Sequence, residues 1–148
     1  MGLFDSLFGK KKTMLADADK KNDAYIAKNP VAANSENELM RTASKLMTSR
    51  KFAESIEVYK KLVDEYPEKS GLYEGQVGAG YYFLGDYTQA IEHYVSAMNH
   101  GGDKSMMDDN IWEASEALFK KNGDKAALQD YLKLFPTGNH KKNAEKLL

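Results

Sequence analysis

Residues 71–98, GLYEGQVGAGYYFLGDYTQAIEHYVSAM, carry the pattern that decides the fold. Their first half places small and large residues on one face at the helical period. Gly85-Asp86 then interrupts the pattern with a turn signal. Their second half has an apolar stripe at three- and four-residue steps, made of Tyr87, Ala90, Ile91, Tyr94, Val95 and Met98. The stretch therefore predicts two helices closed into a hairpin.

The preceding stretch, residues 36–69, repeats this pattern at a constant offset of 35 residues. Small residues align with small residues and large with large. The aligned pairs are Ala43 with Gly78, Leu46 with Tyr81, Phe52 with Tyr87, Ser55 with Ala90, Tyr59 with Tyr94 and Leu62 with Ala97. Pro67 follows at a position where a helix must stop, because proline lacks a backbone N–H. We expect a second hairpin of the same kind.

A third unit, residues 105–136, matches less well. Trp112 fits the opening aromatic position and Gly123-Asp124 repeats the turn, but Glu116 stands at the small-residue position. We interpret Asp108 and Asp109 as caps at the start of the Trp112 helix. A last helix at residues 139–148 is expected to cover the open end with Ala144, Leu147 and Leu148.

The spacing Val-Gly-x2-Tyr followed by Ala-x3-Tyr resembles the tetratricopeptide repeat, a helix-turn-helix unit that stacks into a right-handed solenoid. The resemblance covers about residues 36–136, closely for two units and loosely for the third. It implies an all-α fold, a short right-handed α-solenoid of about three units with a C-terminal capping helix. The units expected are residues 36–70, 71–104 and the degenerate 105–136, within a domain of residues 36–148.

In that family the first helices of the units line a concave groove that binds a peptide or helix of a partner protein. Carried over to this chain, the resemblance implies a chiefly apolar groove. Its residues would be Met40, Ser44, Met47, Gly75, Ala79, Tyr82, Glu113 and Ala117. The alternative for the two methionines is an ordinary core position. Gly75 has no packing reason in the family pattern, so either a partner approaches closely there or the glycine is tolerated.

Composition argues against several classes of function. The net charge is −1 and there is no cysteine, so we expect no nucleic-acid binding, no disulfide and no thiolate metal site. His93 and His100 are about two helical turns apart, roughly 10 Å, too far for one metal ion. No nucleophile, phosphate-loop or paired-carboxylate motif is found. We therefore expect a protein without catalytic activity, metal or cofactor.

The amino-terminal segment, residues 1–12, MGLFDSLFGKKK, is a separate feature. In helical geometry its large apolar residues would lie within about 140°, followed by three lysines. The residues concerned are Leu3, Phe4, Leu7, Phe8, Lys10, Lys11 and Lys12. Such a segment suits weak membrane-surface contact, docking on its own or another protein, or no contact at all. Residues 13–35 are interpreted as a linker, with a short helix at Leu15–Lys28 as an alternative and a capping box at Ser35 and Glu38.

Two functions of different classes follow. The first is a non-catalytic adaptor that binds a protein segment in the groove. The alternative is a membrane-peripheral scaffold or assembly protein anchored through residues 1–12, or a homo-oligomer in which that segment fills the groove of another copy. We expect a cytoplasmic protein, or one peripheral on the inner membrane face, because no secretory signal or membrane span is found.

Overall fold

The computed structural model describes residues 35–148. The predictions for the basic segment 1–12 and for a helix at Leu15–Lys28 lie outside these residues. The described chain is helical without a strand. Its elements are α2 (Glu36–Thr48), α3 (Phe52–Glu65), the short 3-10 helix η3 (Pro67–Lys69), α4 (Ser70–Leu84), α5 (Tyr87–Asn99), α6 (Lys104–Asn122), α7 (Ala126–Leu134) and α8 (Lys141–Leu147). The all-α prediction is confirmed for this part of the chain.

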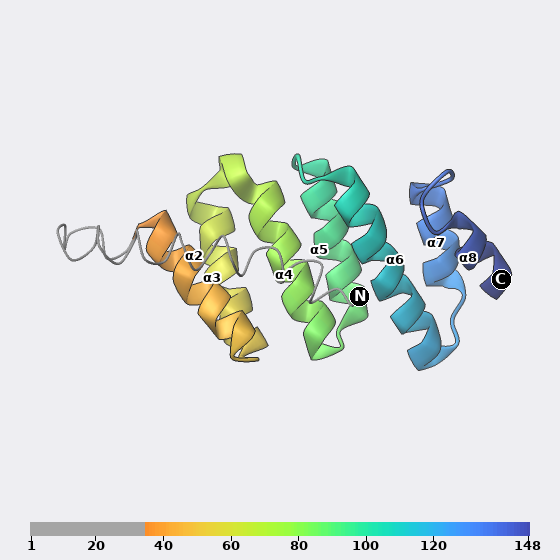
Figure 1. Cartoon of the computed structure of the whole chain (residues 1–148), viewed down its shortest axis with the longest axis horizontal. Helices are drawn as coiled ribbons and strands as arrows, with labels where there is room; N and C mark the ends of the chain where they lie inside the picture. Colours follow the sequence, from red (N-terminus) through yellow and green to blue (C-terminus); the bar gives the residue numbers. More distant parts are fainter. Residues whose placement is uncertain (1–34) are drawn as a thin grey trace.

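The α-helices follow one another in space as they do in sequence. Each one packs against the next, from α2 on α3 through to α7 on α8. Figure 1 shows them as a row, with α2 and α8 at opposite ends. The core accordingly runs along the row. Its largest fully buried side chains include Met47, Leu62, Tyr73, Val77, Tyr94, Ile111, Leu128 and Tyr131.

Small residues let the helices within each of the first two hairpins approach closely. In α3 the Ser55 hydroxyl donates a buried hydrogen bond of 2.7 Å to the Ala43 carbonyl of α2. Between α4 and α5, a Cβ at Gly78 would lie 3.2 Å from the Ala90 carbonyl oxygen. At the sequence offset of 35 residues, Ala43 aligns with Gly78 and Ser55 aligns with Ala90. The two contacts therefore occupy equivalent positions in the two hairpins. The sequence repeat therefore corresponds to a repeated helix–helix contact.

The turns of these two hairpins also have the same backbone hydrogen bonds. Lys51 N–H donates to the Leu46 carbonyl at 2.9 Å, and Asp86 N–H donates to the Tyr81 carbonyl at 3.0 Å. The residue before each donor is left-handed, with φ of 62° at Arg50 and 79° at Gly85. Left-handed dihedrals suit glycine but place the Cβ of other residues near a carbonyl oxygen. The first turn therefore has the same geometry as the second but carries backbone strain, because Arg50 stands where the second turn has glycine.

We expect Arg50→Gly to raise the free energy of unfolding by about 0.5–1 kcal/mol, because relief of the left-handed strain exceeds the entropy that glycine adds to the unfolded chain. Urea denaturation followed by circular dichroism measures the change. Gly85→Ala is the matched control and should lower stability by a similar amount. A destabilised Arg50→Gly variant would mean that the arginine side chain holds this turn.

The amino terminus of α6 differs from the expectation. The helix begins at Lys104, and its cap is Asp103, whose Oδ1 accepts a 2.8 Å hydrogen bond from Met106 N–H. Asp108 and Asp109 lie inside the helix, so their prediction as caps was wrong. A periodic pattern locates a helix but leaves its ends uncertain by several residues when two capping residues compete. Asp108 is 6% exposed and serves tertiary structure instead.

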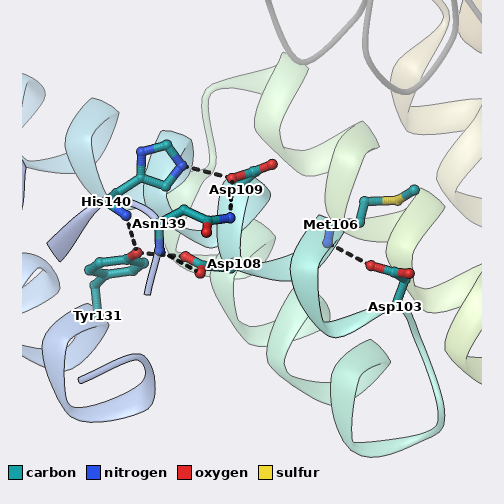
Figure 2. Close-up of polar contacts among 7 residues, drawn as sticks. All are labelled: Asp103, Met106, Asp108, Asp109, Tyr131, Asn139 and His140. Carbon is teal, nitrogen blue, oxygen red and sulfur yellow. Dashed lines mark hydrogen bonds and ion pairs between the residues drawn. The ribbon is translucent and has the colours of Figure 1, made fainter. Parts of the chain in front are cut away.

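Asp108 joins the last two helices to α6. One of its carboxylate oxygens accepts a 2.5 Å hydrogen bond from the Tyr131 hydroxyl and the other accepts a 2.9 Å bond from Asn139 N–H. His140 N–H in turn donates to the Tyr131 hydroxyl at 3.0 Å. Figure 2 shows these side chains converging from α6, α7 and the loop before α8, whereas Asp103 and Met106 pair separately. The carboxylate therefore has partners on both oxygens.

The last helix, α8, is shorter than the predicted 139–148. Ala144 is fully buried and Leu147 is partly buried, whereas Leu148 is 42% exposed. Two of the three residues expected to cover the open end thus contact the core. Within residues 35–148 no helix has the length and apolar character needed to span a membrane.

Candidate functional site

The structure divides the residues proposed for the groove into two groups. Four are buried, namely Ser44, Met47, Gly75 and Ala79. The other four are partly exposed, namely Met40, Tyr82, Glu113 and Ala117. Met47 is fully buried, and its Cε lies 3.6 Å from the position that a Cβ on Gly80 would take. It is therefore a core residue between α2 and α4.

Met40 belongs to the contact that fixes the start of α2 to α4. Its sulfur lies 3.3 Å from the hydroxyl of Tyr73, and that hydroxyl also donates to Glu36. Lys69 Nζ pairs with Glu36 at 2.7 Å. Although partial burial raises the pKa of the Glu36 carboxyl, the hydrogen bonds from Lys69 and Tyr73 outweigh it and hold that pKa below its ordinary value.

Tyr82 and Glu113 mark a second region, at the carboxyl end of α4. The Tyr82 ring packs against the ring of Tyr87, with centroids 5.4 Å apart. Burial raises the pKa of the Tyr82 hydroxyl, and the carboxylates of Glu113 and Glu116 raise it further. Lys120 and Lys121 of α6 also lie close to Tyr87, so acidic and basic side chains both surround this end of α4.

A cleft lies between the amino-terminal halves of α4 and α6. Its volume is about 230 Å³. It is lined by Gly71, Leu72, Gly75 and Gln76 of α4, by the loop Gly101, Gly102 and Asp103, and by Met106 and Met107 of α6. Leu72 is 47% exposed and Met106 is 37% exposed, so two large apolar side chains of the lining remain open to solvent. We call this the α4–α6 cleft.

Gly75 forms part of the floor of the α4–α6 cleft without an internal packing reason. A Cβ on Gly71, Gly78 or Gly80 would come within 2.4–2.6 Å of a neighbouring atom, so those glycines are required by close packing. A Cβ on Gly75 would meet, among the described residues, only the Met107 Cε, at an ordinary 3.7 Å. A mid-helix glycine costs about 1 kcal/mol relative to alanine. Because Gly75 has no side chain, the floor of the cleft stays open at this position.

Gln76 adds a polar group to this apolar cleft. The residue is 6% exposed, and its Oε1 has no hydrogen-bond partner among the residues that the structure describes. A buried acceptor without a partner costs roughly 1–3 kcal/mol. The acceptor would be satisfied by an N–H group entering the cleft. The cleft therefore offers apolar contact at Leu72 and Met106, and the buried, unpaired Oε1 belongs to a residue of its lining.

A second cavity, of about 340 Å³, lies between α3, α4 and α5 and has more charged residues in its lining. Its lining includes Lys60, Asp64, Glu74, Glu92 and His93. The Lys60 ammonium donates a 2.9 Å hydrogen bond to the Tyr81 hydroxyl. Within residues 35–148 no group of three or more acidic or histidine side chains is arranged to hold a metal ion. Several charged side chains line it, whereas Asp103 is the one charged residue of the described chain that lines the α4–α6 cleft.

His93 in this polar cavity gives the fold a predicted pH dependence. Burial lowers the pKa of its imidazole, and Lys60 lowers it further. The unfolded chain then binds the proton more readily than the folded chain. The contribution of His93 to the free energy of unfolding is therefore fully present above about pH 6.5, and it is lost as the pH falls through the lowered pKa. Chemical denaturation between pH 8 and pH 5 measures this. His93→Phe, which keeps the ring stacked on Tyr81, should flatten the profile over that range; an unchanged profile would contradict the assignment.

Comparison with known proteins finds no match to this chain among protein-family models, curated proteins or solved structures.

Of the residues expected in the groove, only Gly75 lines the α4–α6 cleft. The sequence analysis missed Leu72, Gln76 and Met106, which lie on the same two helices. Leu72 and Gln76 flank Gly75 by three positions and one position, so a helical wheel around Gly75 would have pointed to Leu72. No local pattern could have joined them to Met106, because that contact depends on how α6 is placed after the Gly101-Gly102 loop.

Proposed function

We propose that this protein is a non-catalytic adaptor of tetratricopeptide-like helical hairpins that binds an apolar segment of a partner protein in the α4–α6 cleft. The single observation that carries the proposal is the cleft itself. It combines exposed Leu72 and Met106, an open floor at Gly75 and the unsatisfied acceptor of Gln76. A peptide or helix would supply apolar side chains to cover Leu72 and Met106, and an N–H group to pair with the Gln76 acceptor.

The repeated hairpin geometry supports the repeat-protein part of the proposal. The Ala43–Ser55 and Gly78–Ala90 contacts and the two turn hydrogen bonds recur at the offset of 35 residues seen in the sequence. Stacked hairpins of this kind present the first helix of each unit on a common surface. α4 and α6, which line the cleft, are the first helices of the second and third units.

The test is affinity capture from a lysate of the source organism, followed by measurement of direct binding to the captured protein. Leu72→Glu places a charge in the cleft mouth, and Leu84→Glu is the matched control, because Leu84 is 50% exposed on the same helix but does not line the cleft. We expect a protein that Leu72→Glu loses and Leu84→Glu retains. Equal binding by both variants would contradict a role for the cleft.

The sequence MGLFDSLFGKKK favours a second candidate, a membrane-peripheral scaffold held by residues 1–12. Burying four large side chains would contribute roughly 6–12 kcal/mol and the lysines about 1 kcal/mol each, against an ordering cost of roughly 1–2 kcal/mol per residue. Binding to anionic lipid would thus be weak and reversible. Flotation with phosphatidylserine vesicles, with and without residues 1–12, tests it; equal flotation of both chains would eliminate this candidate.

A further inference from the structure

We propose that the α4–α6 cleft is the intramolecular docking site for the chain's own residues 3–8. The observation that carries this inference is that the start of α2 lies close to the part of α4 that lines the cleft. It goes beyond the proposed function and holds whether or not a second protein also uses the cleft.

The start of α2 is fastened beside the cleft. Glu36, one residue after the first described residue, accepts a hydrogen bond from Tyr73 and pairs with Lys69 at 2.7 Å. Tyr73 directly follows Leu72, and it precedes Gly75 and Gln76 within one helical turn. The preceding chain therefore enters the fold within about one or two turns of α4 from the cleft lining.

The intervening chain is long enough to return to the cleft. Residues 13–34 separate the segment from the fold, and 22 residues can span at most about 75 Å. Tethering at such a length gives an effective concentration in the millimolar range. A contact that would be weak between separate molecules is then populated within one molecule.

The chemistry of the segment matches that of the cleft. Leu3, Phe4, Leu7 and Phe8 supply four large apolar side chains within six residues. Leu72 and Met106 are the exposed apolar groups that they would cover, and methionine adapts its shape to an aromatic ring. A backbone or side-chain N–H of the segment would also satisfy Gln76 Oε1.

Charge favours the same encounter. Lys10, Lys11 and Lys12 follow the apolar residues directly, whereas residues 35–148 contain fifteen basic and eighteen acidic side chains. The lysines remain in solvent at the cleft mouth while long-range attraction brings the segment to the fold. This term depends on ionic strength, whereas the apolar contact does not.

The experiment is photocrosslinking of the full-length chain carrying Phe8→p-benzoylphenylalanine. After irradiation of a dilute sample, we expect a crosslink in the monomer band, mapped by mass spectrometry to the peptide that contains Met106 and Met107. Leu72→Glu should reduce its yield about tenfold, since it places a charge where an apolar side chain docks. Leu84→Glu, equally exposed on α4, should leave the yield unchanged.

Circular dichroism and urea unfolding check that both glutamate variants remain folded, and Met106→Lys provides a second disruption from α6. Crosslinks that lie elsewhere, that persist in Leu72→Glu, or that occur only in a dimer band would overturn the proposal. So would a probe that reacts only with added phosphatidylserine vesicles. Failure here leaves the adaptor proposal standing, because that proposal is tested by capture of a separate protein.

Discussion

Asp108→Ala is expected to lower the free energy of unfolding by about 3 kcal/mol. The substitution leaves the Tyr131 hydroxyl without its 2.5 Å acceptor and Asn139 N–H without its 2.9 Å acceptor. Tyr131 is fully buried, so its unpaired hydroxyl costs roughly 1–3 kcal/mol, and the partly buried bond from Asn139 N–H to the carboxylate contributes about 1–2 kcal/mol more. Urea denaturation measures the loss, and amide hydrogen exchange should show it concentrated in α7 and α8, which the carboxylate ties to α6.

Asp109→Ala is the matched control for this prediction. Asp109 is exposed, although it pairs with His140 Nε2 at 2.8 Å and accepts a longer 3.3 Å bond from Asn139. Exposed ion pairs contribute about 0–1 kcal/mol. The control should therefore lose less than a third of what Asp108→Ala loses. Equal losses would show that the buried carboxylate has no special role in holding the carboxyl-terminal helices.

Gly78→Val is expected to destabilise the fold by about 3 kcal/mol, because it forces α4 and α5 apart. A Cβ at Gly78 would lie 2.6 and 2.7 Å from two ring carbons of Tyr94 and 3.2 Å from the Ala90 carbonyl oxygen. Tyr94 is fully buried, so its ring has nowhere to move. Thermal and urea unfolding of the variant measure the loss.

A second glycine on the same helix gives the opposite expectation. Gly75→Ala adds a methyl group that meets only the Met107 Cε at 3.7 Å, so helix propensity alone should decide and stability should rise by about 0.5–1 kcal/mol. The two glycines are three positions apart and differ only in what faces them. A Gly78→Val variant as stable as the original chain would show that the hairpin does not need this close contact.

The sequence predicted the hairpins because their determinants are local. Gly85 takes a left-handed conformation at the predicted turn, and Ser35 caps α2 by accepting from Glu38 N–H as predicted. The Glu38 carboxylate binds Arg41, so the second half of the expected capping box is not formed. The small residues Gly78 and Ala90 meet as their spacing required. In each case the partners lie close together along the chain, so a pattern of spacing is sufficient.

The parts that the sequence did not predict depend on contacts between distant elements. Asp108 was interpreted as a cap because an acidic residue near a helix start is usually one. Its real partners, Tyr131 and Asn139, lie 23 and 31 residues away. The sequence did not predict the α4–α6 cleft for the same reason, since Leu72 and Met106 come together only through the packing of α4, α5 and α6. Met47 was placed on the groove by resemblance and is instead fully buried in the core.

The most direct measurement of the central claim is the affinity of the captured partner for the full-length protein and for Gly75→Leu. The leucine side chain would occupy the open floor of the α4–α6 cleft, while unfolding curves on the same samples report the stability of the fold. The account predicts at least about tenfold weaker binding, equal to 1.4 kcal/mol, by a variant that the unfolding curves show to be folded. Unchanged affinity in a folded Gly75→Leu variant would contradict the claim that a partner segment binds in this cleft.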